Sequence, residues 1–416
     1  MSQFFSSRET QNSSEREQYL CSALAEFIKY AKTQCDYYRE ALADIDASAI
    51  NSRAMLATLP VTRKADLIKL QTQRAPLAGL DAHSAKIGRL FQSPGPINEP
   101  ESTTDDWWRL GSAFYAAGFR ASDKVQNCLS YHLTPGGFIL DSGARACGCV
   151  VIPAGPGQSE QQLDVIEGLR PEGYCGTPSF LKILLDKATA SNRDISSIRK
   201  ALVTGEAYLP HHREQFAQAG ILALQAYATA DVGLIAYESD PHEGLIVAED
   251  IIVEIVRPGT NQLVPKGEVG EVVVTSFNRD YPLLRFATGD LSALLEGQSQ
   301  CGRTNMRIKG WMGRADQTTK VKGMFVHPQQ VEKVRLQHSA VSKVRLVVSR
   351  QQQQDQMLLL CEVDSEIEVE DHASELLALI ATSLKNITKL NGKVQLVSAR
   401  TLPDDGKVIE DIRELA

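Results

Sequence analysis

The sequence predicts an α/β protein with a large N-terminal domain, in which helices cover parallel sheets beside a β-rich subdomain, and a small α+β C-terminal domain. Three observations predict this fold. Short apolar runs alternate with helical stretches over residues 125–227, strand-like runs dominate residues 251–322, and the last hundred residues combine both patterns. At roughly 150 residues per domain, the 416 residues allow two to three domains. We place the domain boundary between residues 1–315 and residues 316–416.

The chain is expected to begin with a helix, after which strands and helices alternate. Apolar residues at positions 20, 24, 27, 28 and 31 share one face of a helix expected over residues 15–42. Strands are then expected at 127–131, 148–153, 174–177, 200–204 and 222–227, with helices at 161–169, 179–189 and 211–219. This alternation indicates a parallel sheet, and ligands of such sheets bind at the carboxyl ends of the strands.

The later elements change in character. Strands are expected at 251–256 and 271–275, joined by a hairpin-like segment, and residues 304–322 are strand-rich. The C-terminal domain is expected to contain a helix at 328–338, strands at 344–348 and 357–363, a helix at 372–387 and a strand at 393–397.

Composition excludes several classes of function. With 44 basic and 51 acidic residues the net charge is -7, and only 6% of residues are aromatic, so we expect no nucleic-acid partner. No run of 18 apolar residues occurs, so we expect no membrane span. Eight scattered cysteines indicate reduced thiols and a cytoplasmic location. Cys147 and Cys149 lack the second pair of a zinc site, and we expect them to start a buried strand.

Five loops carry residues typical of catalytic or binding sites. They are residues 202–210, 225–233, 281–290, 313–323 and 402–408. Each alone has a structural explanation: Thr288-Gly289-Asp290 is a common turn, and Gly406-Lys407 is typical of a solvated loop. Their order and spacing are the informative feature.

In that order, the loops resemble the motifs of the adenylate-forming superfamily of acyl-CoA synthetases and, within it, of the phenylacetate-CoA ligase family. The resemblance extends from about residue 38 to residue 415. It implies an AMP-binding domain over residues 1–315 and a mobile lid domain over 316–416. It also implies that ATP and Mg²⁺ activate a carboxylic acid, aryl or otherwise small, to an acyl-adenylate, which then forms a thioester with coenzyme A.

The resemblance also implies a role for each motif residue. Lys407 is the mobile lysine of adenylation, Asp231 binds Mg²⁺, and His132 lies near the acyl group. The nucleotide and coenzyme A would meet Ser93, Gly205, Glu206, Ala207, Tyr227, Ala228, Thr229, Asp290, Arg314, Lys322 and Gly323. Within this set Tyr227 stacks on adenine, Asp290 accepts hydrogen bonds from the ribose hydroxyls, and Lys322 faces the pantetheine tunnel. Asp316 would be the hinge. A structural strand-end histidine is an equally good interpretation of His132.

One segment departs from the family pattern. The phosphate-binding loop is replaced by residues 91–100, in which Pro94 and Pro96 remove two N–H donors and Glu99 stands where the family has a cation. A carboxylate beside a triphosphate is repulsive unless a metal ion bridges them. The adenosine half of the site is therefore expected to be intact and the pyrophosphate half to be altered.

Two alternatives stay open at this stage. Adenylation can be followed by transfer to an amine or a carrier-protein thiol, and sequence discriminates poorly between these acceptors and coenzyme A. The altered loop also fits a protein that binds AMP or an acyl-adenylate without turnover, although Lys407 argues against it. The identity of the acid, a possible homodimer and full catalysis by the altered loop are not decided by these residues.

Overall fold

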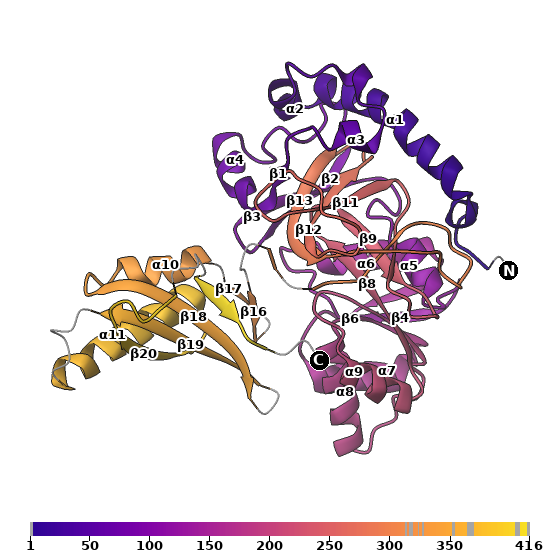
Figure 1. The fold of residues 1–416 in the computed structure, drawn as a ribbon. Helices are drawn as coiled ribbons and strands as arrows, with labels where there is room; N and C mark the ends of the chain where they lie inside the picture. Colours follow the sequence, from indigo (N-terminus) through magenta and orange to yellow (C-terminus); the bar gives the residue numbers. More distant parts are fainter. Residues whose placement is uncertain are drawn as a thin grey trace. The chain divides into compact units, whose positions relative to one another are not determined.

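The computed structural model describes residues 3–312, 314–315, 319–322, 324–326, 328–351, 354–363, 370–403 and 408–413. The chain divides into two compact units, Met1–Gly313 (unit 1) and Arg314–Ala416 (unit 2). Both contain helices and mixed sheets, so the predicted α/β class is confirmed (Figure 1). The interpretation of the units as an AMP-binding domain and a lid stays a proposal.

The central element of unit 1 is, in its described part, a nine-stranded sheet with the order β14-β15-β10-β9-β8-β7-β6-β4-β5. Its strands are β4 (Lys124–Asn127), β5 (Val150–Pro153), β6 (Gly173–Gly176), β7 (Lys200–Val203), β8 (Leu222–Thr229), β9 (Gly233–Glu238), β10 (Leu245–Val247), β14 (Leu294–Leu295) and β15 (Arg307–Ile308). Strands β5, β4, β6, β7 and β8 run parallel, as predicted. From β8 onward the pairing is antiparallel.

Helices cover both faces of the parallel strands. They are α5 (Gly111–Ala116), α6 (Gly136–Ala146), α7 (Ser159–Leu169), α8 (Pro178–Ala190) and α9 (Pro210–Gln218). Along β7, Ala201 and Val203 pack with α7, α8 and α9, whereas Leu202 belongs to the core on the opposite face with α5 and α6. Successive side chains of a strand point to opposite faces, so an apolar run here fills two cores.

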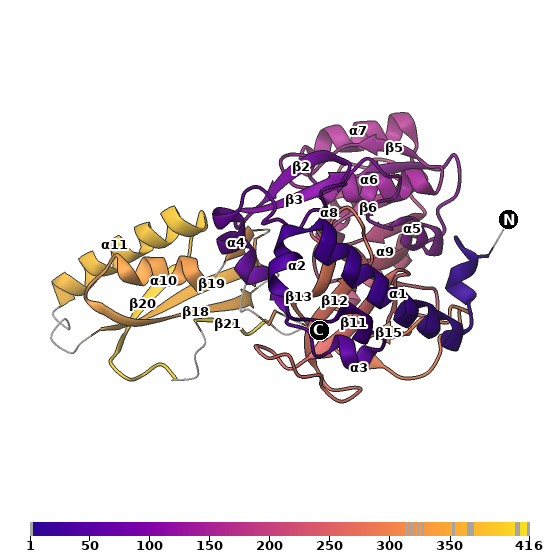
Figure 2. The ribbon, with the colours of Figure 1, turned by 90° about the horizontal axis from the view of Figure 1, so that it is seen from above.

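A second sheet of unit 1 has the order β1-β13-β12-β11 in the described residues. Its strands are β1 (Thr62–Arg63), β11 (Ile251–Val256), β12 (Gly270–Ser276) and β13 (Leu283–Ser292), and a separate hairpin joins β2 (Ile87–Ser93) to β3 (Ile97–Ser102). The N-terminal helices, which lie beside this sheet (Figures 1 and 2), are α1 (Ser13–Gln34), α2 (Asp36–Ala41), α3 (Arg53–Leu56) and α4 (Leu67–Gln73), with the 3-10 turns η1 (Ser7–Thr10), η2 (Ala47–Ala49) and η3 (Lys64–Asp66).

Three expectations about elements were wrong in detail. The helix expected over residues 15–42 is two helices, because Cys35 takes an extended conformation (φ -120°, ψ 124°) that ends α1. The strand expected at 127–131 ends at Asn127, whose side chain then turns the following loop by accepting from the Leu129 N–H. Residues 304–322 contain only the short strands β15 and β16 (Thr319–Val321) in their described part.

Unit 2 is a small α+β module. Strands β18 (Val341–Gln351) and β19 (Gln354–Val363) form a hairpin flanked by β20 (Lys393–Ser398) and β21 (Ile409–Asp411), in the order β20-β19-β18-β21. Helices α10 (Pro328–Leu336) and α11 (Glu370–Thr388) bury Val331, Val334, Ile380 and Leu384 against the sheet (Figure 2). A two-stranded hairpin, β16 with β17 (Met324–Val326), precedes them.

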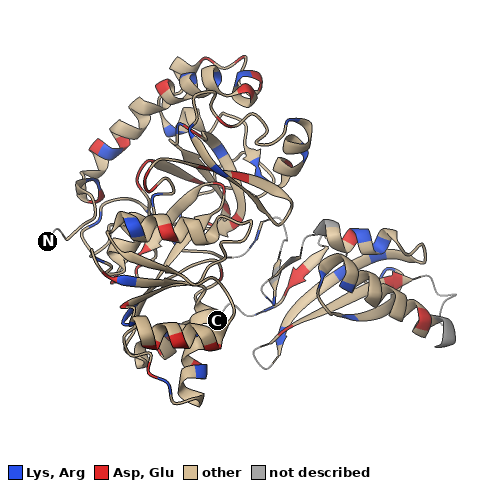
Figure 3. Cartoon of the chain, turned by 180° about the vertical axis from the view of Figure 1, so that it is seen from behind, with Lys and Arg blue, Asp and Glu red and all other residues tan. Residues whose placement is uncertain are grey.

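The surface carries mixed charge. Figure 3 shows basic and acidic residues intermixed along the helices of both units. Within the described residues, none of the helices combines the length and apolarity needed to cross a bilayer. All eight cysteines are free, and Cys149 is buried immediately before β5, whereas Cys147 ends α6. The strand was expected to be buried, but β5 is the last strand of its sheet and its residues are exposed or partly exposed, so this expectation was wrong.

Candidate active site

Two predicted nucleotide-binding residues meet between the two sheets of unit 1. The hydroxyl of Tyr227, on β8, donates to Oδ2 of Asp290, on β13, at 2.8 Å. The Trp311 indole donates to Oδ1 of Asp290 at 3.0 Å, and the Asp290 N–H donates to the Thr288 hydroxyl at 3.1 Å. Both Tyr227 and Asp290 are buried. Tyr227 and Trp311 therefore fix the two oxygens of the carboxylate, while the Thr288 hydroxyl holds the Asp290 backbone.

The predicted ligand-binding residues Gly205, Glu206 and Ala207 form a turn just after β7. Gly205 has a φ of +83°, a backbone conformation that L side chains rarely adopt, so the turn favours glycine. The Thr204 hydroxyl donates to the Ala226 carbonyl at 2.7 Å and ties the turn to β8. Glu206 accepts a hydrogen bond from the Ser179 N–H at 2.6 Å, at the start of α8. The Glu206 side chain therefore links two strand-end loops, while Ala207 leaves the backbone of the turn uncovered by a long side chain.

The end of β8 carries three further predicted residues. Ala228 and Thr229 are partly buried, and the Thr229 hydroxyl accepts from the Val232 N–H at 3.2 Å. Asp231 lies in the turn to β9, and its side chain has 0% exposure. Lys64 Nζ, from η3, lies 2.5 Å from Asp231 Oδ2. No motif marked Lys64, which reaches this point because β1 pairs with β13 just before it.

The segment expected to be a phosphate loop is a closed hairpin instead. Ser93 pairs with Ile97, so only Pro94, Gly95 and Pro96 connect β2 to β3. The Ser93 N–H, which a phosphate loop would offer to its anion, donates to Glu99 Oε2 at 3.3 Å. Two further backbone donors of the hairpin are also used: the Gln92 N–H donates to the Leu133 carbonyl at 2.8 Å and the Asn98 N–H to Gln71 Oε1 at 2.8 Å.

Glu99 lies inside the protein and has 0% exposure. Burial, followed by the negative charge of Asp231, raises the pKa of Glu99 to about 8, against the opposing effect of Lys64. Tyr281, just before β13, is also buried, and burial together with the charges of Asp231 and Glu99 raises the pKa of its hydroxyl well above the usual value. Lys64, Glu99, Asp231 and Tyr281 thus form one cluster from four separate segments.

The predicted acyl side of the site lies after β4. His132 is exposed, and its imidazole makes no hydrogen bond or ion pair with any described residue, so its catalytic role stays a prediction. Its neighbour Tyr131 is held instead: the hydroxyl accepts from Asn127 at 2.7 Å and donates to Asp141 at 3.3 Å. Aromatic rings continue from it, with centroid distances of 5.1 Å for Tyr131–Phe138, 5.3 Å for Phe138–Phe91 and 6.3 Å for Phe91–Trp108.

The remaining predicted residues belong to unit 2. Arg314 is partly buried, and Lys322 is exposed with a φ of +48°. The Lys322 N–H donates to Asp355 Oδ2 at 3.1 Å, and Asp355 is itself paired with Arg413 at 3.0 Å. The turn that carries Lys322 is thus anchored on the β18–β19 hairpin. Asp316, Gly323 and Lys407 lie outside the described residues.

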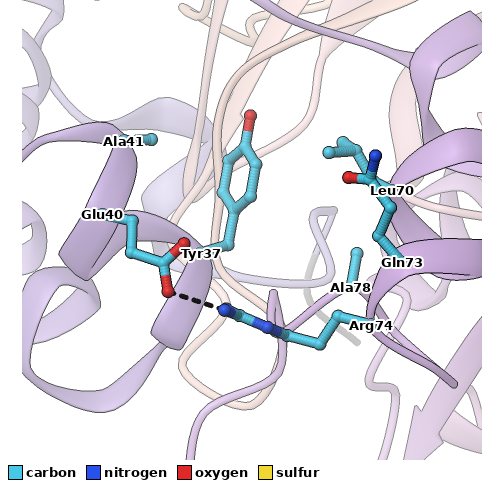
Figure 4. A pocket seen from close by; sticks show the side chains of 7 residues that line it. All are labelled: Tyr37, Glu40, Ala41, Leu70, Gln73, Arg74 and Ala78. Carbon is cyan, nitrogen blue, oxygen red and sulfur yellow. Dashed lines mark hydrogen bonds and ion pairs between the residues drawn. The ribbon is translucent and has the colours of Figure 1, made fainter.

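A surface pocket of about 370 Å³ lies elsewhere in unit 1. It is lined by Tyr37, Glu40, Ala41, Leu70, Gln73, Arg74 and Ala78. Arg74 extends across it to Glu40, 2.6 Å away (Figure 4). None of the predicted site residues lines this pocket, and its rim is neutralised by the ion pair.

Known proteins match the chain along most of its length. The family model for AMP-binding enzymes matches residues 107–278, and the model for the AMP-binding enzyme C-terminal domain matches residues 323–412. The chain is 27% identical to a phenylacetate-coenzyme A ligase of Thermus thermophilus, with 94% of this chain and 95% of the relative covered. It is 26% identical to a phenylacetate-coenzyme A ligase of Aromatoleum evansii, with 89% and 87% covered.

A solved structure shares the fold. It is the 2-hydroxyisobutyryl-CoA ligase in complex with 2-HIB-AMP and CoA, with a TM-score of 0.83, 20% identity, and coverage of 100% of this chain and 93% of that one. The match includes all elements from the N-terminal helices to the C-terminal module. The chain therefore belongs to the AMP-binding enzymes, the adenylate-forming superfamily whose motifs it resembles, and within them to the phenylacetate-CoA ligase-like family.

Proposed function

We propose that this protein uses ATP to activate a small aryl acid as its acyl-adenylate and then transfers the acyl group to coenzyme A. Its family makes it an AMP-forming acid–thiol ligase. The observation that carries the assignment of the site is the meeting of Tyr227 and Asp290, from two different sheets, beside the strand end that carries Asp231.

The two half-reactions have different needs. In the first, a carboxylate oxygen of the acid attacks the α-phosphorus of ATP and the bond to pyrophosphate breaks. Asp290 would hold the ribose so that the α-phosphorus stays in place, and positioning of this kind supplies a large part of rate enhancement. In the second, the coenzyme A sulfur attacks the acyl carbon, AMP leaves, and the thiol proton passes to solvent. Lys322, anchored through Asp355, is placed on the turn assigned to this step.

Asp231 fits the part of a Mg²⁺ ligand. Its Oδ1 is buried and has no hydrogen-bond partner among the described residues, and carboxylate oxygens suit a hard cation. When bound, Mg²⁺ neutralises charge on the phosphate oxygens. Asp231 is held in position by Lys64, which leaves Oδ1 for the ion.

The aryl class is supported by two features. The relatives from Thermus thermophilus and Aromatoleum evansii are named phenylacetate-coenzyme A ligases. The loop after β4 also leads into the ring series Tyr131, Phe138, Phe91 and Trp108. The flat apolar faces of these rings suit an acid whose acyl part is aromatic better than an acid whose acyl part carries a further charge.

The test is release of pyrophosphate from Mg-ATP with phenylacetate, benzoate, 2-hydroxyisobutyrate and short fatty acids, each with and without coenzyme A. We expect release with aryl acids that becomes multiple-turnover only when coenzyme A is present. Turnover with hydroxylamine or a carrier-protein thiol, but not with coenzyme A, would show that the acyl acceptor is an amine or a carrier protein and not coenzyme A. Binding of AMP with no release for any acid would instead favour a protein that binds nucleotide without turnover, the reading that the closed β2–β3 hairpin supports.

A further inference from the structure

The cluster around Asp231 contains two buried carboxylates and one lysine. Glu99 has 0% exposure and the Asp231 side chain also has 0%. Lys64 Nζ lies against Asp231 Oδ2. Ionised together, the three groups carry one net negative charge inside the protein, and an uncompensated buried charge is costly.

Three polar atoms in this cluster are unsatisfied. Glu99 Oε1, Asp231 Oδ1 and the Tyr281 hydroxyl are buried and have no hydrogen-bond partner among the described residues. A buried polar atom without a partner costs about 1–3 kcal/mol, and more when it is charged. Glu99 and Tyr281 both lie near enough to Asp231 for its charge to act on them. Three such atoms on neighbouring side chains from three segments indicate that the cluster is completed by something that binds between them.

Other buried acids of unit 1 show what is unusual here. Several of them bond to an arginine, such as Glu101 to Arg89 at 2.7 Å, Glu271 to Arg63 at 2.7 Å and Glu254 to Arg285 at 3.0 Å. In the described part of the chain, Glu99 accepts only the Ser93 N–H. Glu101 lies two residues further along the same strand and is paired with an arginine. The lack of an arginine partner for Glu99 is therefore a property of its surroundings and not of the strand.

We propose that Glu99 and Asp231 together hold one divalent cation, Mg²⁺, with water and the phosphates of ATP filling its other positions. The proposal rests on the proposed function for the nucleotide and adds Glu99 as a ligand. Mg²⁺ is commonly bound through one or two carboxylates plus substrate phosphates.

The arrangement also accounts for the acidic residue in place of the family's cation. Glu99 would act as a second carboxylate ligand and hold the ion in place. The positive charge of the ion would then neutralise the phosphates, as the loop cation does in the family pattern. Tyr281 can donate to a metal-bound water, and Lys64 holds Asp231 from the other side.

The experiment measures metal binding in the full chain without acid or coenzyme A. Mn²⁺ is titrated in the presence of the β,γ-imido analogue of ATP, and bound ion is followed by the relaxation of water protons. We expect Glu99→Gln and Asp231→Asn each to raise the Kd for Mn²⁺ at least ~10-fold. Glu101→Gln, which removes a buried charge from the same strand, should leave the Kd unchanged.

The outcomes separate this proposal from the proposed function. Glu99→Gln that binds Mn²⁺ as tightly as the unsubstituted chain, with tryptophan fluorescence showing a folded unit 1, would overturn it, as would an unsubstituted chain that binds no Mn²⁺. Should Glu99→Gln fail to fold, Glu99→Asp keeps the charge with a shorter reach; weaker Mn²⁺ binding supports the proposal and unchanged binding contradicts it. Because no acid is present, a wrong assignment of the acid leaves these results unaffected.

Discussion

Asp290 shows how single side chains prepare the site for a nucleotide. Its carboxylate is fixed by the Tyr227 hydroxyl and the Trp311 indole, so little conformational freedom is lost when it accepts ribose hydroxyls. Hydrogen bonds to a charged group contribute about 1.5–3 kcal/mol. Asp290→Ala should therefore raise the apparent KM for ATP roughly 10- to 100-fold, measured by initial rates of pyrophosphate release. Glu296→Ala, an exposed acid after β14, is the control; an unchanged KM in Asp290→Ala would place the ribose elsewhere.

The site residues divide by whether a local pattern marks them. Tyr227 and Asp290 lie near the ends of β8 and β13, and Asp231 follows β8; each belongs to a motif, and the order of the motifs led to their prediction. Lys64 and Tyr281 lie in no motif. Their positions depend on β1 pairing with β13 and on the turn before β13, contacts between segments more than 200 residues apart. Such contacts leave no periodic signal in the chain, so the sequence pointed to Glu99 and Asp231 but not to Lys64 and Tyr281.

At the scale of elements, alternation predicted the parallel strands and their helices, while the turns were harder. By resemblance, residues 91–100 were expected to stand in place of the family's phosphate-binding loop, with Pro94 and Pro96 removing two N–H donors. The flanking residues pair as strands nonetheless, since Phe91 and Ile97 are buried in the main core. The α1–α2 break at Cys35 was missed for a similar reason: the apolar period continues through it, and only the backbone conformation shows the break.

The start of α5 supplies a pH-dependent test. Asp106 accepts hydrogen bonds from the Gly111 N–H, the first of the helix, at 3.0 Å and 3.2 Å. Burial raises the pKa of Asp106 from 3.8 to about 6. Between these values the unfolded carboxyl is ionised and the folded one is protonated, so its contribution to stability falls as pH rises from 4 to 6. Over the whole pH range, a pKa shift of this size lowers the free energy of unfolding by about 3 kcal/mol.

The prediction compares Asp106→Asn with the unsubstituted chain in urea at pH 4 and pH 7. Asparagine tolerates the positive φ of Asp106, 46°, and does not titrate. The free energy of unfolding of the variant should gain about 2 kcal/mol relative to the unsubstituted chain between the two pH values. All three tryptophans lie in unit 1, so their fluorescence reports this unit alone. Asp105→Asn, at an exposed neighbour, should show no such gain; equal pH dependence in both variants would contradict the prediction.

At the scale of the whole molecule, the two units match two separate family models, and the curated relatives span nearly the same length. The length of 416 residues exceeds one ordinary core and allowed two to three domains. The two units bury separate apolar clusters. The division matters for chemistry: the nucleotide-side residues Tyr227, Asp231 and Asp290 all belong to unit 1, whereas Arg314, Lys322 and Lys407 belong to unit 2.

This division makes the half-reactions separable by one substitution in unit 2. Lys407 is assigned by resemblance to adenylation alone, where an ammonium group neutralises charge that develops on the phosphate oxygens. Lys407→Ala should reduce acid-dependent pyrophosphate release by about 10²–10³-fold, yet leave thioester formation from supplied acyl-adenylate and coenzyme A close to that of the unsubstituted chain. Lys393→Ala, at an exposed lysine of β20, should change neither rate. Equal loss of both half-reactions in Lys407→Ala would show that the lysine supports the fold or both steps, and its assignment to adenylation would then be wrong.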